Sequence, residues 1–258
     1  MTDGSFPKEE NRVHCKQPPM RIVITSGPSY EPLDKVRRLS NFSTGELGTL
    51  LAEGFAEAGH AVTCFRGVAS TFAAPLWPVE VVPFTTNESL AEGLHRLPAR
   101  EGATLVLHAA ALCDFRVRDI RNEKGEPLDR NKASSRAGNL QLTLEPTAKL
   151  IASLRRLFPA SILVGWKYEL DGTVDDIKAK GRKQMDDYLT DACVLNGEAY
   201  GSGFGVISRS GEQAHLPDKA ALCRFLIDWA ERMPMALNKP GQESFHALST
   251  FNSLSPFI

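Results

Sequence analysis

The chain has 258 residues and 42% of them are hydrophobic, which is enough for the core of one large domain or two small ones. Its formal net charge of −1 provides no overall basic field for nucleic acid. No apolar run approaches the roughly 20 residues of a membrane span, and the polar N-terminus lacks the apolar stretch of a signal peptide. We therefore expect a cytoplasmic protein that binds neither nucleic acid nor membrane.

Short apolar runs alternate along the chain with segments of helical periodicity. Residues 1–19 are polar and predict a disordered N-terminal arm. The expected strands are Met20–Thr25, Ala61–Phe65, Val79–Phe84, Thr104–Ala111, Leu140–Leu144, Ser161–Tyr168 and Ala192–Asn196. The expected helices are Ser43–Ala58, a segment from Asn87 as N-cap to about Leu97, Thr147–Phe158, Val174–Tyr188 and Asp218–Arg232.

A second pattern follows near the C-terminus, where Ser210-Gly211 separates the runs Phe204–Ile207 and Gln213–Leu216 and indicates a hairpin. Residues 234–258 show no period and are expected to be a tail. The order of elements predicts an α/β fold: one Rossmann-like domain over residues 20–233, with a mostly parallel sheet, helices on both faces and a C-terminal β-hairpin. Ligands of such sheets bind beyond the carboxyl ends of the strands.

The loop after the first strand is the main candidate for a ligand site. Small polar residues gather before the expected helix, and glycines remove side chains where a backbone must approach closely; the residues are Gly27, Ser40, Asn41, Ser43, Thr44, Gly45 and Gly48. Free amides at a helix N-terminus suit an anion, so the loop predicts a phosphate site. An ordinary N-cap cluster with packing glycines is the alternative. Neither a P-loop nor a compact G-x-G-x-x-G is present.

Three other strand ends also carry polar or aromatic groups. Ala109-Ala110-Ala111 leaves space for a ligand and is followed by Asp114, which suits a ribose or base. Trp166-Lys167 would stack a base and pair with a phosphate, and Asn196 ends a later strand. Each of these residues alone could instead be a helix or turn cap or close the edge of the sheet. The convergence of the four strand ends on one edge favours a binding site.

The segment between residues 116 and 139 is long, polar and without a period. Seven basic and four acidic residues leave it an excess of three positive charges. Such a stretch inside a compact domain is typical of a lid, and we expect a mobile basic lid that closes over the phosphate site. A solvated surface loop is the alternative.

The cysteines and histidines give no sign of a metal site. The five cysteines, Cys15, Cys64, Cys113, Cys193 and Cys223, stand singly without a C-x-x-C pair, as in a protein whose thiols stay reduced. The six histidines show no metal-ligand spacing, so no protein-bound structural metal is expected.

Together these motifs resemble the phosphopantothenoylcysteine synthetase family. Ser40-Asn41-Phe42-Ser43-Thr44-Gly45 is similar to its S-N-x-S-[ST]-G signature, and Ala110-Ala111 with Asp114-Phe115 to its A-A-x-x-D-[FY] element. The remaining matches, in colinear order from about Met20 to Arg232, are Gly27-Pro28 with Glu31-Pro32-Leu33-Asp34, Lys132-Ala133-Ser134-Ser135, Trp166-Lys167-Tyr168-Glu169 and Asn196.

The resemblance implies a ligase of coenzyme A biosynthesis that joins 4′-phosphopantothenate to cysteine through an acyl-nucleotide. It implies CTP or ATP with Mg²⁺, a homodimer with small-molecule substrates, and no flavin, because the flavin-dependent decarboxylase half of many bacterial members is not matched. Asn41 would contact the acyl-nucleotide and Lys132 would neutralise charge from a mobile loop. The other residues assigned to nucleotide or substrate are Gly27, Ser40, Ser43, Thr44, Gly45, Ala110, Ala111, Asp114, Trp166, Lys167 and Asn196.

The chain departs from the family pattern at several positions. Glu46 stands where a basic residue is common, and Gln184 and Tyr188 fall where bacterial members have a lysine pair, which leaves CTP and ATP both open. One alternative is a nucleotide-binding paralogue without ligase activity. Another is an NADP-dependent oxidoreductase, with Arg66 on the 2′-phosphate, although no Tyr-x-x-x-Lys pair is present.

Overall fold

The structure is a computed structural model, and it describes residues 18–76, 78–97, 102–129, 131 and 138–233. The expected tail at 234–258, nearly all of the expected N-terminal arm, and Lys132 lie outside these residues. No helix among the described residues is long and apolar enough to span a membrane.

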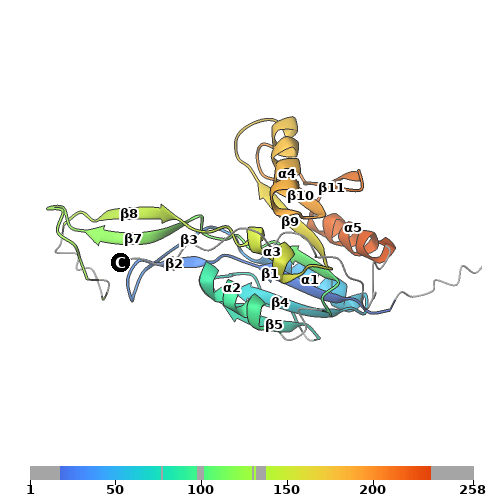
Figure 1. The fold of residues 1–258 in the computed structure, drawn as a ribbon, viewed down its shortest axis with the longest axis horizontal. Helices are drawn as coiled ribbons and strands as arrows, with labels where there is room; N and C mark the ends of the chain where they lie inside the picture. Colours follow the sequence, from blue (N-terminus) through green and yellow to red (C-terminus); the bar gives the residue numbers. More distant parts are fainter. Residues whose placement is uncertain (1–17, 77, 98–101, 130, 132–137, 234–258) are drawn as a thin grey trace, which may run out of the picture.

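One twisted sheet organises the fold (Figure 1). Its strands are β1 (Arg21–Ser26), β4 (Ala61–Gly67), β5 (Glu80–Phe84), β6 (Leu105–His108), β9 (Ile162–Tyr168), β10 (Ala192–Asn196), β11 (Phe204–Ser208) and β12 (Gln213–Leu216). Their order is β12-β11-β10-β9-β6-β1-β4-β5. The strands from β10 to β5 pair in parallel, whereas β11 and β12 pair antiparallel as the C-terminal hairpin. The predicted fold class is therefore confirmed.

Helices cover both faces of this sheet. Side chains alternate between the two faces along β1, so the clusters that they join show which helices lie on each face. Ile22 and Ile24 join the core formed with α1 (Glu46–Glu57) and α5 (Lys219–Arg232). Val23 points to the other face, where α2 (Asn87–Arg96) and α3 (Ile151–Leu157) pack. The long helix α4 (Val174–Tyr188) covers β9 and β10 on that second face.

The ends of the helices follow local capping chemistry. Asp218 accepts a 2.7 Å hydrogen bond from the Ala221 amide at the start of α5. Helix α2 begins one residue earlier than expected: the Thr86 side chain, not that of Asn87, caps it by accepting from the Ser89 amide. Asn87 instead donates 2.7 Å to the carbonyl of Cys113, because its side chain is buried between α2 and the segment after β6.

Two antiparallel ribbons extend together from the carboxyl side of the sheet (Figure 1). One pairs β2 (Tyr30–Pro32) with β3 (Arg38–Ser40), and the other pairs β7 (Phe115–Arg121) with β8 (Gln141–Pro146). A small apolar cluster around Leu33, Val117 and Ile120 packs between them. The expected lid segment thus begins as a strand that the sequence analysis did not predict, because pairing with β8 supplies order that the residues of β7 do not signal by themselves.

Candidate active site

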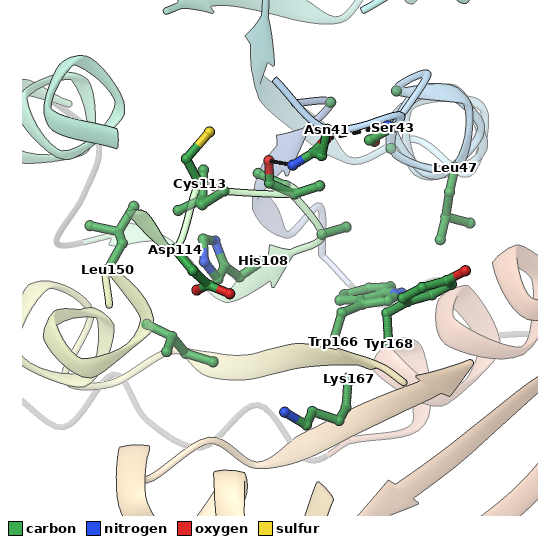
Figure 2. A pocket seen from close by; sticks show the side chains of 18 of the residues that line it. Asn41, Ser43, Leu47, His108, Cys113, Asp114, Leu150, Trp166, Lys167 and Tyr168 are labelled. Carbon is green, nitrogen blue, oxygen red and sulfur yellow. Dashed lines mark hydrogen bonds between the residues drawn. The ribbon is translucent and has the colours of Figure 1, made fainter. Parts of the chain in front are cut away.

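A cavity of about 870 Å³ opens at the carboxyl ends of β1, β6, β9 and β10 (Figure 2). Its walls come from the segment before α1, the segment after β6, the turn before α3 and the end of β9. Helix α4 contributes Gln184 and the start of α5 contributes Lys219. This volume lies within the range of pockets that hold small ligands, and its position at the carboxyl edge is the one predicted from the order of elements.

The start of α1 forms a tight backbone cradle on one side of the cavity. Gly27 and Gly45 both have a φ of 80°, a left-handed conformation that favours glycine. Gly48 packs against β1 so closely that a Cβ there would overlap the hydroxyl oxygen of Ser26. That hydroxyl donates 3.1 Å to the carbonyl of Gly45, so strand and helix start are fixed to each other.

Asn41 bridges the helix start and the segment after β6. Its Nδ2 donates 2.8 Å to the carbonyl of Ala111, and its Oδ1 accepts 3.3 Å from the backbone amide of Ser43. The two bonds fix which end of the side chain is the donor. An amide nitrogen carries two hydrogens, so Asn41 keeps one donor beyond its bond to Ala111 while its side chain lines the cavity.

The segment after β6 provides a backbone wall and one carboxylate. Ala111 pairs with the loop after β1, because its amide donates 3.0 Å to the Gly27 carbonyl and its own carbonyl accepts from the Ser29 amide at 3.1 Å. Asp114 is exposed at the rim, where it forms a 3.1 Å ion pair with Lys149 from the turn before α3. A solvated carboxylate of this kind exchanges partners readily.

The end of β9 sends side chains to both faces. Trp166 and Tyr168 extend toward Leu47 on α1, and Lys167 lies on the opposite side (Figure 2). The indole N–H of Trp166 is buried without a hydrogen-bond partner among the described residues. Lys167 pairs with Glu169 at 2.8 Å, and hydrogen bonds from Lys167 and Lys180 lower the pKa of the Glu169 carboxyl.

Most predicted site residues come together in this cavity. The lining includes Gly27, Asn41, Ser43, Thr44, Gly45, Ala110, Ala111, Asp114, Trp166, Lys167 and Asn196. Ser40 belongs instead to β3, where its hydroxyl donates 2.9 Å to the Ser29 carbonyl and holds the loop. Lys132 lies outside the described residues. The oxidoreductase alternative loses its main residue, since Arg66 is buried against Thr49 and the Phe72 carbonyl and is not among the described lining residues.

Glu46 has a partner that the linear sequence does not show. Its carboxylate accepts a hydrogen bond from Lys219 at the start of α5, and both side chains line the cavity. Helices α1 and α5 pack side by side on one face of the sheet, which brings the two residues together across 173 positions. The acidic charge at this helix start is therefore balanced by a lysine.

The sequence analysis also missed His108, which ends β6 and lines the cavity. Its Nδ1 lies 2.8 Å from the hydroxyl of Thr25 on β1, and burial lowers the pKa of the imidazole to about 4. The available signal was a histidine at the carboxyl end of an apolar strand run, directly before Ala109-Ala110-Ala111.

The described cysteines are free thiols, and most of them lie away from the cavity. Cys64, Cys113, Cys193 and Cys223 are free. Burial raises the pKa of Cys64, Cys193 and Cys223 to about 12, so these thiols stay protonated near neutral pH. Only Cys113 lines the cavity among the described cysteines, and burial also raises its pKa.

Comparison with known proteins identifies relatives of this chain. Residues 19–231 match the family described as DNA/pantothenate metabolism flavoprotein C-terminal domain. The chain is 30% identical over 186 residues to the coenzyme A biosynthesis bifunctional protein CoaBC of Thermococcus kodakarensis, covering 70% of this chain and 42% of that protein. It is 28% identical over 204 residues to CoaBC of Bacillus subtilis, covering 76% and 47%. The chain thus spans less than half the length of these relatives.

Solved structures share the fold. The DNA/pantothenate metabolism flavoprotein of Streptococcus pneumoniae superimposes with a TM-score of 0.71 at 22% identity, covering 81% of this chain and 97% of that one. A mutant of Cab2 in complex with phosphopantothenate-cysteine gives a TM-score of 0.63 at 20% identity, covering 83% and 87%. With a family match over nearly all described residues, the chain belongs to the DNA/pantothenate metabolism flavoprotein C-terminal domain family, which is the phosphopantothenoylcysteine synthetase domain family.

Proposed function

We propose that this protein joins 4′-phosphopantothenate to L-cysteine, using a nucleoside triphosphate, in coenzyme A biosynthesis. The observation that carries the proposal is the bridge from Asn41 to Ala111, which holds an amide donor over a cavity with a helix start on one side and an exposed carboxylate on the other. Family membership supports the same chemistry, since CoaBC proteins are among the relatives found.

The reaction takes place in two steps. The phosphopantothenate carboxylate attacks the α-phosphate of the nucleotide, the bond to the β-phosphate breaks, and pyrophosphate leaves. The amine of cysteine then attacks the acyl carbon, the bond to the nucleotide oxygen breaks, and the nucleoside monophosphate leaves with the amine losing a proton. No electrons are gained or lost by either substrate, so the ligation itself needs no flavin.

The residues at the cavity suit these steps. The free amides at the start of α1, with Ser43 and Thr44, suit the phosphates. The remaining N–H of Asn41 would donate to the acyl oxygen as negative charge develops on it during amine attack. Asp114 would accept from ribose hydroxyls, and Trp166 offers an aromatic surface to the base.

The nucleotide is CTP or ATP, accompanied by Mg²⁺. The described residues include no group of three or more His, Cys, Asp or Glu placed to hold a metal. In nucleotide sites Mg²⁺ usually binds through substrate phosphates, water and one or two carboxylates. When bound, Mg²⁺ reduces the negative charge of the triphosphate.

A pyrophosphate-release assay tests the function directly. Purified protein is incubated with phosphopantothenate, cysteine, Mg²⁺ and either CTP or ATP, and phosphopantothenoylcysteine is identified by mass spectrometry. We expect product with at least one nucleotide and none when phosphopantothenate is omitted. Absence of product with both nucleotides would favour a nucleotide-binding paralogue.

We also propose that the protein is a homodimer. The β7–β8 ribbon supports this, because Leu142 and Leu144 are exposed on β8 while Thr143 between them is half-buried. Apolar side chains exposed on one face of a strand form a candidate contact surface for a second copy of the chain. Light scattering after size exclusion should give twice the chain mass of 28.3 kDa, and a monomer at micromolar concentration would contradict it.

A further inference from the structure

His108 is a cavity residue whose hydrogen bonds define one chemical role. Its ring lines the cavity, yet only 8% of the residue is exposed. In Figure 2 it lies along the wall between Asp114 and Trp166. Strand β6 pairs with β9 through Leu107 and Val164, so the end of β6 stands beside the end of β9 that carries Trp166.

Thr25 fixes the tautomer of this imidazole. The Thr25 hydroxyl oxygen accepts 3.3 Å from the Ala110 amide and lies 2.8 Å from Nδ1 of His108. The hydroxyl hydrogen has no other acceptor among the described residues, so we assign Nδ1 as its acceptor and place the ring hydrogen on Nε2. Thr25 is fully buried, so water does not compete for this bond.

The second ring nitrogen faces the cavity. Within the described part of the chain, Nε2 has no hydrogen-bond partner. It is also absent from the fully buried side-chain atoms that lack a partner, so it is accessible from the cavity that His108 lines. A group with this geometry is a donor of one hydrogen bond. Burial lowers the pKa to about 4, so the donor is uncharged near neutral pH.

We propose that His108 is a further binding residue of the site, which donates a hydrogen bond from Nε2 to an uncharged acceptor on the nucleoside part of the nucleotide. The proposal rests on the proposed function. An uncharged donor suits a ribose oxygen or a base carbonyl, whereas phosphates are better served by the amides of α1 and by lysines. The flanking Asp114 and Trp166 are the residues suited to the ribose and the base.

Calorimetric titration with CMP and AMP tests this assignment without turnover. The nucleotide that binds the wild type is titrated into His108→Leu, and we expect about three- to tenfold weaker binding, the worth of one neutral hydrogen bond. Binding of phosphopantothenate should stay unchanged. His108→Gln, whose amide nitrogen occupies a position close to Nε2, should recover most of the affinity.

Three results would overturn the proposal: unchanged nucleotide affinity in His108→Leu, a loss confined to phosphopantothenate, or a Gln variant no better than Leu. Should His108→Leu fail to fold, the ring nitrogens of the wild type are followed by NMR. We expect the Nε2–H tautomer, and a shift of Nε2 when the nucleotide is added; an unmoved Nε2 signal contradicts the contact. If the wild type binds nucleotide but releases no pyrophosphate, the proposed function is contradicted, whereas the contact between His108 and the nucleotide is not.

Discussion

The side-chain amide of Asn41 donates a 2.8 Å hydrogen bond to the carbonyl of Ala111, 70 residues further along the chain. The same carbonyl accepts from the Ser29 amide, so one oxygen joins the loop after β1, the segment before α1 and the segment after β6. These three segments of backbone are thereby held together around the cavity, and the Asn41 amide is fixed in position among them.

Replacing Asn41 by Asp should lower kcat by about 10²- to 10³-fold, the usual cost of removing one donor to a developing oxyanion. The carboxylate keeps the acceptor for Ser43 but loses the N–H and adds a negative charge. Steady-state kinetics with varied cysteine measure the effect. Ser40→Ala serves as control, since Ser40 lies outside the cavity lining, and its kcat should change far less. Full activity of Asn41→Asp would remove Asn41 from the mechanism.

If Lys219 acts by neutralising Glu46, a variant that also removes the Glu46 charge should regain the nucleotide affinity lost without the lysine. Lys219→Met leaves an unbalanced carboxylate at the start of α1 and should weaken triphosphate binding about two- to fivefold. Adding Glu46→Gln removes that charge and should restore the affinity. Calorimetry on the single and double variants measures the coupling. If the double variant binds as weakly as Lys219→Met, the lysine contacts the phosphates directly.

His108 predicts a specific loss of stability in acid. Its ordinary pKa is 6.5 and burial lowers it to about 4 in the folded protein. Between these values the unfolded chain binds a proton that the folded protein does not, so stability falls as the pH drops from about 6.5 to 4. The difference amounts to roughly 3 kcal/mol at the acid end.

Urea unfolding of the wild type and of His108→Gln across this pH range isolates the effect. Other groups titrate equally in both proteins, so the gap in unfolding free energy should shift in favour of the Gln variant as the pH falls. Parallel curves would mean that the imidazole titrates normally in the folded protein.

Gly48 should be intolerant of even a methyl group. A Cβ there would overlap the Cβ of Ser26 and lie 3.1 Å from its Cα, so α1 must move away from β1. We expect Gly48→Ala to destabilise the fold by about 1–3 kcal/mol and to weaken nucleotide binding. Gly54→Ala, in the same helix, meets only a terminal methyl of Ile227 at 2.9 Å. It should be near neutral in urea unfolding, because roughly 1 kcal/mol of helix propensity offsets the contact. Equal stability of the two variants would contradict the packing argument.

The sequence by itself determined the order of elements and the edge at which the site lies. Short apolar runs and a period of 3.6 residues are local properties, so β1, α1 and β10 were recognisable from their own residues. Parallel strands bring their carboxyl ends to one edge, which is why Asn41, Asp114, Trp166 and Asn196 were predicted to meet without knowledge of the strand order.

The tertiary structure decided what depends on neighbours distant in sequence. Strand β8 was expected from Leu140–Leu144, but β7 was not, because its order comes from pairing with β8 and from the small cluster it shares with the other ribbon. The negative charge of Glu46 has no partner nearby in the sequence, but the packing of α5 on α1 places Lys219 against it. His108 became a donor with a defined tautomer only because β6 lies next to β1, which places the Thr25 hydroxyl against its ring. Hydrogen-bond partners and charge balance are set by which elements adjoin in space, and no periodicity in the chain encodes that adjacency.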